Sequence, residues 1–254
     1  MSCYRNTVIL SAIISIITVL FVKIFTFDGD PVIAVATRFM GKMFSAMAAI
    51  VILQTIGYLD IDDLIPEFTL LTYDQFIDTY VIPLSITMGF FNGIILDKLI
   101  YGNQGILPRS STEDKCSYLI LGPISEEFIY RVILINLLRH CYSPSISGII
   151  ASVFFSLSHS HYHLNLRRLL GRCQWFPFFF HTLSTLVFGL YASLIYLRVQ
   201  STVVVIIIHS FFNYMGLIRV ERVFKQWWLY ITDFIGVIIA MISLYFFIRD
   251  SVTN

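Results

Sequence analysis

Two adjacent carboxylates and an arginine stand at the start of a long apolar stretch of this chain. The segment from Leu121 to Arg131 reads Leu-Gly-Pro-Ile-Ser-Glu-Glu-Phe-Ile-Tyr-Arg and continues with apolar residues. In a helix, Glu127 and Arg131 are one turn apart and can form an ion pair that locks two helices together. Glu126 points about 100° away around the helix and does not share that partner. A charge in a membrane-length segment costs about 2.5–3.5 kcal/mol, so Glu126 is the candidate for chemistry.

Histidines and an asparagine occur in two further apolar stretches. Phe155 and His159 are four residues apart, as are His209 and Asn213, so each pair shares one face of a helix. Taken singly, an intramembrane histidine or asparagine is often explained by a hydrogen bond between helices. Together with Glu126 they make a Glu/His/His/Asn set, a composition suited to acid–base catalysis on a buried water molecule.

The amino-acid composition indicates that membrane helices position these residues. The chain has 254 residues, of which 57% are hydrophobic and 13% charged, and its mean hydropathy is +0.79. A soluble domain typically carries about 25% charged residues. The sequence therefore predicts an all-α, polytopic membrane helical bundle in contact with the lipid bilayer. The net charge of +1 says nothing about a nucleic-acid partner, and none is expected because no basic run resembles an RNA- or DNA-binding patch.

About eight transmembrane helices are predicted from the apolar stretches. They cover residues 7–27, 42–59, 80–96, 119–138, 147–158, 176–197, 202–217 and 230–248. Two of them are shorter than the roughly 20 residues that a membrane helix needs, so they are expected to be tilted or buried in the bundle. We interpret 1–254 as a single membrane domain and 117–216 as its catalytic core.

The four cysteines are Cys3, Cys116, Cys141 and Cys173, with no two in a Cys-x-x-Cys spacing. This scattered pattern predicts neither a disulfide framework nor a zinc site.

The distribution of lysine and arginine predicts the orientation of the chain. With eight spans, eleven basic residues fall on one side of the membrane and four on the other. The richer side is expected to be cytoplasmic. Its residues are Arg38, Lys42, Lys98, Arg109, Lys115, Arg167, Arg168, Arg172, Arg219, Arg222 and Lys225, against Arg5, Arg139, Arg198 and Arg249 on the other side.

This orientation places the candidate residues in one leaflet. Glu126 would lie about 10 Å inside the cytoplasmic boundary, at ~1.5 Å of rise per residue from Leu119. His159 would stand near the cytoplasmic end of its span, and Asn213 would be shallower than His209. The three groups therefore face the same compartment, which favours a shared site.

The three motifs, taken in order, resemble those of the type II CAAX prenyl endopeptidase family, the glutamate-type intramembrane proteases. They are Glu126-Glu127-x-x-x-Arg131, Phe155-x-x-x-His159 and His209-x-x-x-Asn213. Flanking features typical of the eukaryotic branch are Gly122-Pro123, His159-x-His161, Phe188-Gly189-x-Tyr191 and the His-Ser-Phe-x-Asn-Tyr-Met-Gly sequence ending at Gly216. The resemblance covers approximately 117–216.

The resemblance implies an endopeptidase that removes the C-terminal tripeptide after the prenylated cysteine of CAAX proteins, such as small GTPases. It implies the endoplasmic reticulum membrane, with the active site facing the cytoplasm. Carried over by position, Glu126 and His159 activate the attacking water, and His209 and Asn213 donate hydrogen bonds to the oxyanion. Supporting roles fall to Glu127, Arg131 and Phe155. No cofactor and no catalytic metal are expected.

Three other interpretations stay open. A glutamate with two histidines is also a zinc-ligand set, although the His-Glu-x-x-His motif is absent. A non-catalytic membrane scaffold on the same helical fold would not require an intact Glu/His/His/Asn set. A transporter or proton pathway predicts polar residues across both leaflets, and the first three spans have few.

Overall fold

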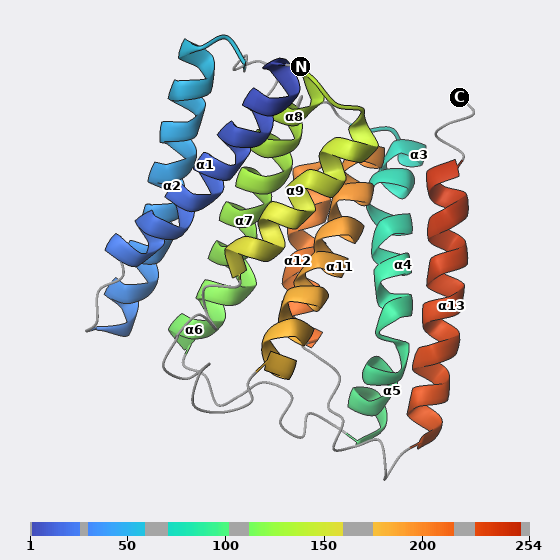
Figure 1. The fold of residues 1–254 in the computed structure, drawn as a ribbon. Coiled ribbons are helices and arrows are strands. Elements are labelled where there is room, and N and C mark those ends of the chain that lie inside the picture. Colours follow the sequence, from blue (N-terminus) through green and yellow to red (C-terminus); the bar gives the residue numbers. More distant parts are fainter. Residues whose placement is uncertain are drawn as a thin grey trace. The chain divides into compact units, whose positions relative to one another are not determined.

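The computed structural model describes residues 2–25, 30–58, 71–101, 112–159, 175–215 and 227–249, and in these ranges every regular element is a helix (Figure 1). The predicted all-α class is confirmed for this part of the chain. The chain divides into two compact units, which we describe separately. The first unit comprises Met1–Glu67 and Leu121–Thr202, and the second comprises Phe68–Ile120 and Val203–Asn254. The single membrane domain 1–254 stays a prediction.

Four helices are long and apolar enough to cross a membrane, namely Cys3–Phe25, Pro31–Thr55, Phe178–Val199 and Trp227–Arg249. A fifth candidate is the pair Tyr73–Phe90 and Asn92–Ile100, which is bent by 75°. The chain is therefore a multi-pass membrane protein with four or five candidate spans among the described residues. The finer count of eight is not shown by these helices.

The first unit contains the helices that carry the first two motifs. In chain order these are α1 (Ser2–Phe25), α2 (Pro31–Thr55), α7 (Gly122–Glu127), the π-helical segment η4 (Phe128–Ile135), α8 (Asn136–Arg139), α9 (Pro144–His159) and α11 (Trp175–Val199). α2 begins where Asp30 accepts a hydrogen bond from the backbone N–H of Val32 at 2.8 Å, an N-cap that satisfies a donor of the first turn. α1 packs along α2, and α9 packs along both α11 and η4.

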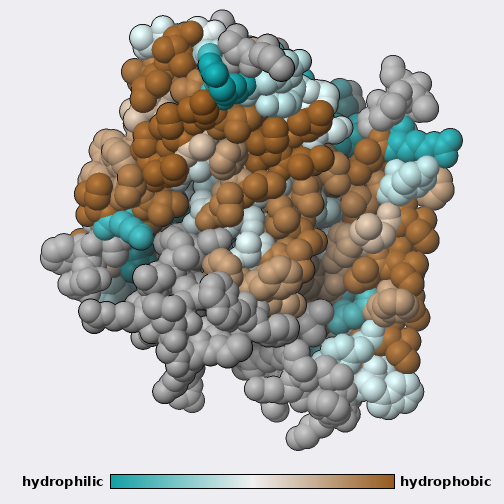
Figure 2. All heavy atoms as spheres, viewed as in Figure 1, coloured by the Kyte–Doolittle hydropathy of each residue, from teal (hydrophilic) through white to brown (hydrophobic). Residues whose placement is uncertain are grey.

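Apolar side chains cover the outside of these helices, as expected for contact with lipid. Figure 2 shows them gathered across the face in view. Ile16 on α1 is 58% exposed and Met47 on α2 is 61% exposed. The interior of the unit is equally apolar, because Ile133, Leu134 and their neighbours on η4 are fully buried. Polar groups inside the unit therefore stand out as requiring partners.

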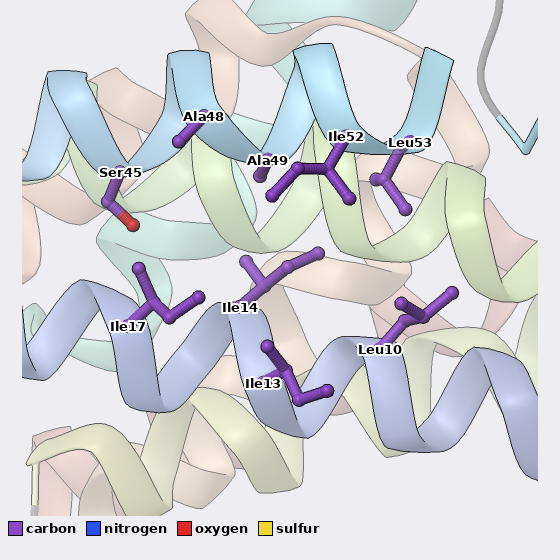
Figure 3. Close-up of a pocket in the computed structure, with 9 residues that line it drawn as sticks. All are labelled: Leu10, Ile13, Ile14, Ile17, Ser45, Ala48, Ala49, Ile52 and Leu53. Atoms are coloured by element: carbon purple, nitrogen blue, oxygen red, sulfur yellow. The ribbon is translucent and has the colours of Figure 1, made fainter. Parts of the chain in front are cut away.

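The seam between α1 and α2 combines an apolar pocket with one polar contact. Figure 3 shows the pocket, whose lining is Leu10, Ile13, Ile14, Ile17, Ser45, Ala48, Ala49, Ile52 and Leu53. Ser45 contributes its hydroxyl, which pairs with the hydroxyl of Thr18 on α1 at 2.8 Å. Hydroxyl pairs of this kind hold membrane helices together. Apolar cavities stay dry, so a water-based reaction is not expected here.

A disulfide joins the start of α1 to the turn after α8, which corrects the interpretation of the cysteines from sequence. Cys3 and Cys141 are bonded across a sequence separation of 138 residues. The hydroxyl of Tyr142 donates a hydrogen bond to the carbonyl oxygen of Tyr4 at 3.2 Å beside it. Spacing along the chain could not reveal this pair, because only the packing of α1 against α8 brings the two residues together. Cys116 is a free, exposed thiol.

The second unit contains the helix of the third motif. Its elements are α3 (Tyr73–Phe76), the π-helical η2 (Ile77–Val81), α4 (Ile82–Phe90), α5 (Asn92–Tyr101), α6 (Thr112–Cys116), the π-helical η3 (Ser117–Leu121), α12 (Thr202–Met215) and α13 (Trp227–Arg249). α13 packs against both α4 and α5. The predicted third span, 80–96, is therefore a broken helix, since α4 ends at Phe90 and α5 starts at Asn92.

Small residues and one carboxylate stabilise this break. Asp233 on α13 accepts a hydrogen bond from the backbone N–H of Gly93 at 2.6 Å, so a donor freed by the bend is satisfied within the unit. A Cβ on Gly236 would collide with the carbonyl oxygen of Gly89, and one on Gly93 would collide with the carbonyl oxygen of Leu229. The backbones of α13, α4 and α5 thus approach closely only because these positions are glycines.

We predict that Gly236→Ala loosens the packing of α13 against α4. Overpacking of this kind costs about 1–3 kcal/mol of folding free energy, so the thermal midpoint of the detergent-purified protein should fall. Ile239→Ala, at a 58% exposed position of the same helix, is the matched control and should leave the midpoint nearly unchanged. Equal midpoints for Gly236→Ala and the wild type would contradict the close crossing.

We also predict that thiol labelling will detect the disulfide. The unfolded, unreduced wild-type protein should react with a maleimide-linked polymer at two cysteines, and at all four after reduction. Cys3→Ser and Cys141→Ser should each expose the thiol of the other partner and so label at three sites without reductant. Labelling of all four wild-type cysteines without reductant would contradict the pairing.

Candidate active site

Glu126 and His159 meet in the first unit. Nε2 of His159 lies 3.3 Å from Oε2 of Glu126, and their side chains are 18% and 15% exposed. Glu126 is near the end of α7, and His159 is the last residue of α9. α9 packs along η4, the segment that directly continues α7, and this packing brings His159 to Glu126. Two residues that the sequence predicts to act together are thus in direct contact, and a small part of each remains accessible.

The hydrogen bonds of His159 determine which of its nitrogens can act on water. Nδ1 lies 2.8 Å from the carbonyl oxygen of Phe155. A carbonyl can only accept, so we assign the proton to Nδ1. Nε2 then faces the carboxylate of Glu126 as a second acceptor. A direct hydrogen bond between Nε2 and the carboxylate requires a proton on one of them. When neither carries a proton, a water molecule can donate one hydrogen bond to Nε2 and one to the carboxylate.

A pocket of about 30 Å³ opens beside these two side chains. A volume of roughly 10–15 Å³ is enough for one water molecule. Its lining residues are Thr18, Val19, Val22, Lys42, Glu126, Tyr130, Ser158 and His159. The mixture of a carboxylate, an ammonium, an imidazole and hydroxyl groups provides the polar partners that an ordered water needs. This pocket, unlike the apolar one between α1 and α2, suits a hydrolytic reaction.

Lys42 is a member of this site that the sequence analysis missed. It was counted among the cytoplasmic connecting charges, because the second span was predicted to begin at residue 42. α2 in fact begins at Pro31, so Lys42 lies inside the helix. Its Nζ is 2.5 Å from Oε1 of Glu126. The one signal in the sequence was a cation directly followed by a long apolar stretch that begins at Met43.

Tyr130 also lines the pocket, and its spacing could have revealed it. It stands four residues after Glu126, so both side chains fall on the same side of the helix. The ring is buried, with 1% of its surface exposed. It packs edge to face on Phe155, with 5.3 Å between the ring centroids. Tyr130 therefore forms the floor of the site rather than its rim.

Glu127 and Arg131 form the buried ion pair that their spacing predicts. Nε of Arg131 lies 3.1 Å from Oε2 of Glu127, and neither side chain is exposed. A second guanidinium nitrogen, Nη2, approaches the carbonyl oxygen of Gly189 on α11 at 3.4 Å. The guanidinium also lies 4.7 Å from the ring centroid of Phe155. Arg131 thus connects the helix of Glu126 with both α9 and α11.

Phe155 packs between the ion pair and the histidine of the site. Its ring centroid is 4.4 Å from that of His159, and its own side chain is buried. The ring therefore contacts both the guanidinium of Arg131 and the ring of His159, and it restricts the orientation of the imidazole. This contact packs the phenylalanine of the second motif against the histidine four residues later.

The helix carrying these charges is π-helical immediately after Glu127. The π-helical segment η4 extends over Phe128–Ile135 and is buried from Ile129 onward. A π-helix has a wider turn, and such segments are frequent at functional sites. In the first turn of α7, the hydroxyl of Ser125 donates a hydrogen bond to the carbonyl oxygen of Leu121 at 2.8 Å. The two glutamates therefore lie directly before a change in helical geometry.

His209 and Asn213 lie in the second unit, on α12. His209 is buried, with 4% of its surface exposed. The side-chain amide of Asn213 donates a hydrogen bond to the carbonyl oxygen of Tyr118 at 2.7 Å, which fixes the orientation of the amide. Its nitrogen carries two hydrogens, and this contact uses one. The structure brings Glu126 and His159 together, whereas the participation of His209 and Asn213 in the same site stays a prediction.

Comparison with known proteins identifies relatives over the region of these motifs. Residues 116–215 match the family model described as type II CAAX prenyl endopeptidase, Rce1-like. The chain is 29% identical over 111 residues to CAAX prenyl protease 2 of Caenorhabditis elegans, covering 39% of this chain and 38% of that protein. It is 26% identical over 100 residues to CAAX prenyl protease 2 of Homo sapiens, covering 38% of this chain and 30% of that protein. No solved structure matches the chain.

The buried ion pair leads to a prediction about stability. Removing one member of a buried pair leaves an uncompensated charge, which costs about 3–5 kcal/mol. Arg131→Met should therefore lower the thermal midpoint of the purified protein strongly. The double variant Glu127→Leu/Arg131→Met removes both charges and should recover most of this loss. A double variant as unstable as the single one would show that Arg131 acts through contacts other than Glu127.

Proposed function

Because residues 116–215 match the Rce1-like type II CAAX prenyl endopeptidase family model and the chain is distantly similar to two CAAX prenyl proteases, we propose that the protein is an intramembrane CAAX prenyl protease. It hydrolyses the peptide bond after the prenylated cysteine of CAAX proteins and releases the C-terminal tripeptide. The observation that carries this proposal is the contact of Glu126 with His159 beside a pocket that can hold water.

The reaction begins with a water molecule between the two side chains. Glu126, as a carboxylate, and Nε2 of neutral His159 accept hydrogen bonds from this water, so its oxygen lone pair faces the scissile carbonyl. As the oxygen bonds to the carbonyl carbon, its proton moves to the Glu126–His159 pair. General-base assistance of this kind contributes about 10²–10⁴-fold to the rate.

Collapse of the tetrahedral intermediate returns the proton. The C–N bond breaks as the proton moves from the Glu126–His159 pair to the departing amine, which leaves as the free tripeptide. In this proposal His209 and Asn213 donate hydrogen bonds to the oxyanion before collapse. Each such donor is commonly worth about 3–4 kcal/mol of transition-state stabilisation. Glu127, Arg131 and Phe155 do not touch the substrate and support the helices that present Glu126 and His159.

The proposal includes a setting in the cell. The substrates are prenylated CAAX C-termini, such as those of small GTPases, presented at the cytoplasmic face of the endoplasmic reticulum membrane. The chain crosses the bilayer about eight times, and the lipid of the substrate remains in the membrane while the tail enters the site. Catalysis proceeds through the protein's own side chains and the activated water, without a metal ion.

The test is endoproteolysis of a farnesylated CAAX peptide by the purified protein, with the released tripeptide measured by mass spectrometry. Glu126→Gln should lower kcat/KM by at least about 10²-fold, since the amide cannot accept the proton. Asp78→Asn changes an exposed carboxylate and is the matched control, which should retain wild-type activity. A chelator should leave the activity intact.

Three results would contradict the proposal. Cleavage by Glu126→Gln at the wild-type rate would remove the glutamate from the mechanism. Loss of wild-type cleavage in the chelator, restored by added zinc, would favour a metal site. No cleavage of farnesylated or geranylgeranylated peptides by folded wild-type protein would favour a non-catalytic scaffold.

A further inference from the structure

Lys42 contacts the proposed general base from a different helix. Its Nζ is 2.5 Å from Oε1 of Glu126 across a sequence separation of 84 residues, while Oε2 faces His159. The two oxygens of the carboxylate therefore have different partners. One is held by an ammonium group and the other is directed at the imidazole. Neither the family resemblance nor the spacing of the motifs assigns a role to Lys42.

A cation at this point of α2 is costly unless a partner compensates it. The segment after Lys42 is apolar, and a lysine at the centre of a membrane helix costs about 2.5–3.5 kcal/mol. Arg38, one turn earlier on α2, is exposed, whereas 16% of the Lys42 side chain is exposed. Lys42 is thus turned into the site rather than outward. The ion pair with Glu126 compensates its charge.

Among the described residues, the other charged and titratable groups near Glu126 make different contacts from that of Lys42. On its own helix, Glu127 and Arg131 compensate each other, and Tyr130 is a buried phenol. From α9, His159 shares the opposite oxygen of the carboxylate. α1 contributes Thr18, Val19 and Val22 to the wall of the pocket, none of them charged. Within the described part of the first unit, the cation in direct contact with Oε1 is Lys42.

We propose that Lys42 is a positioning residue for the general base: its ammonium group binds Oε1 of Glu126, keeps the carboxylate ionised, and leaves Oε2 directed at His159 and the attacking water. This inference rests on the proposed function, because it assumes that ionised Glu126 accepts the proton of the water. The charge of Lys42 also affects the later step in which Glu126 gives up the proton, because an adjacent cation disfavours a protonated carboxyl group. Lys42 therefore also favours transfer of the proton to the departing amine.

The direction of the pH effect follows from the charge. A positive charge in contact with a carboxylate makes protonation occur at lower pH. When that charge is removed, Glu126 becomes protonated, and inactive as a base, at higher pH. Lys42→Met keeps the aliphatic stem and removes the charge. The acidic limb of the pH profile of kcat/KM should then move upward by about one pH unit or more, the size expected for an opposite charge at this distance.

The experiment compares pH profiles of cleavage of the farnesylated peptide. Lys42→Met and Lys42→Gln should shift the acidic limb upward, and Lys42→Arg, which retains the charge, should return it toward wild type. Arg38→Met removes a cation from the exposed side of the same helix and should keep the wild-type profile. Infrared titration gives a second readout that needs no turnover. The protonated-carboxyl band that disappears in Glu126→Gln should titrate at higher pH in Lys42→Met.

The outcomes separate this inference from the proposed function. Wild-type protein that cleaves no prenylated peptide contradicts the proposed function itself. An active wild type with unshifted acidic limbs and infrared titration in both neutral variants overturns the role of Lys42 alone. A raised KM with unchanged kcat and unchanged pH profile would instead assign Lys42 to the carboxylate end of the substrate, and would also overturn the positioning role.

Discussion

An ion pair with no access to water connects the helices of the first unit. Burying two charges costs several kcal/mol per ion, and the pair persists because each charge compensates the other and their helices hold them together. Arg131 forms an ion pair with Glu127 on its own helix, approaches the Gly189 carbonyl on α11, and lies against the Phe155 ring of α9. These contacts restrict how α9 can slide or rotate, and so they determine where His159 stands relative to Glu126.

The two adjacent glutamates differ in their surroundings. Glu127 is buried and bound to a guanidinium from one turn away, so it has no access to a substrate. Glu126 is 15% exposed, contacts Lys42 and His159, and borders a pocket. Neighbouring positions on a helix point about 100° apart, which is enough to direct one carboxylate inward and the other toward the pocket. Two glutamates at adjacent positions therefore have different surroundings, one inside the helix packing and one at the pocket.

The sequence predicts most of the helices of the described chain and the local contacts within them. The pairing of Glu127 with Arg131 was predictable because both lie on one helix, where spacing determines distance. Lys42 was assigned wrongly for the opposite reason: its partner is 84 residues away, and no local pattern encodes that approach. The disulfide was not predicted because its two cysteines are also far apart in the sequence, at a separation of 138 residues. The break after Phe90 depends on glycines and on Asp233 from α13, which hydropathy alone does not detect.

The disulfide between Cys3 and Cys141 joins two parts of the chain that are synthesised at different times. Residue 141 is synthesised 138 residues after residue 3, an interval on the order of ten seconds at ~5–20 residues per second. During that interval α1 exists without the α8 partner to which it becomes fastened. Thr18, Val19 and Val22 of α1 form one wall of the pocket beside Glu126. α1 must therefore wait for the helix that carries Glu126 before the pocket beside this residue can be enclosed.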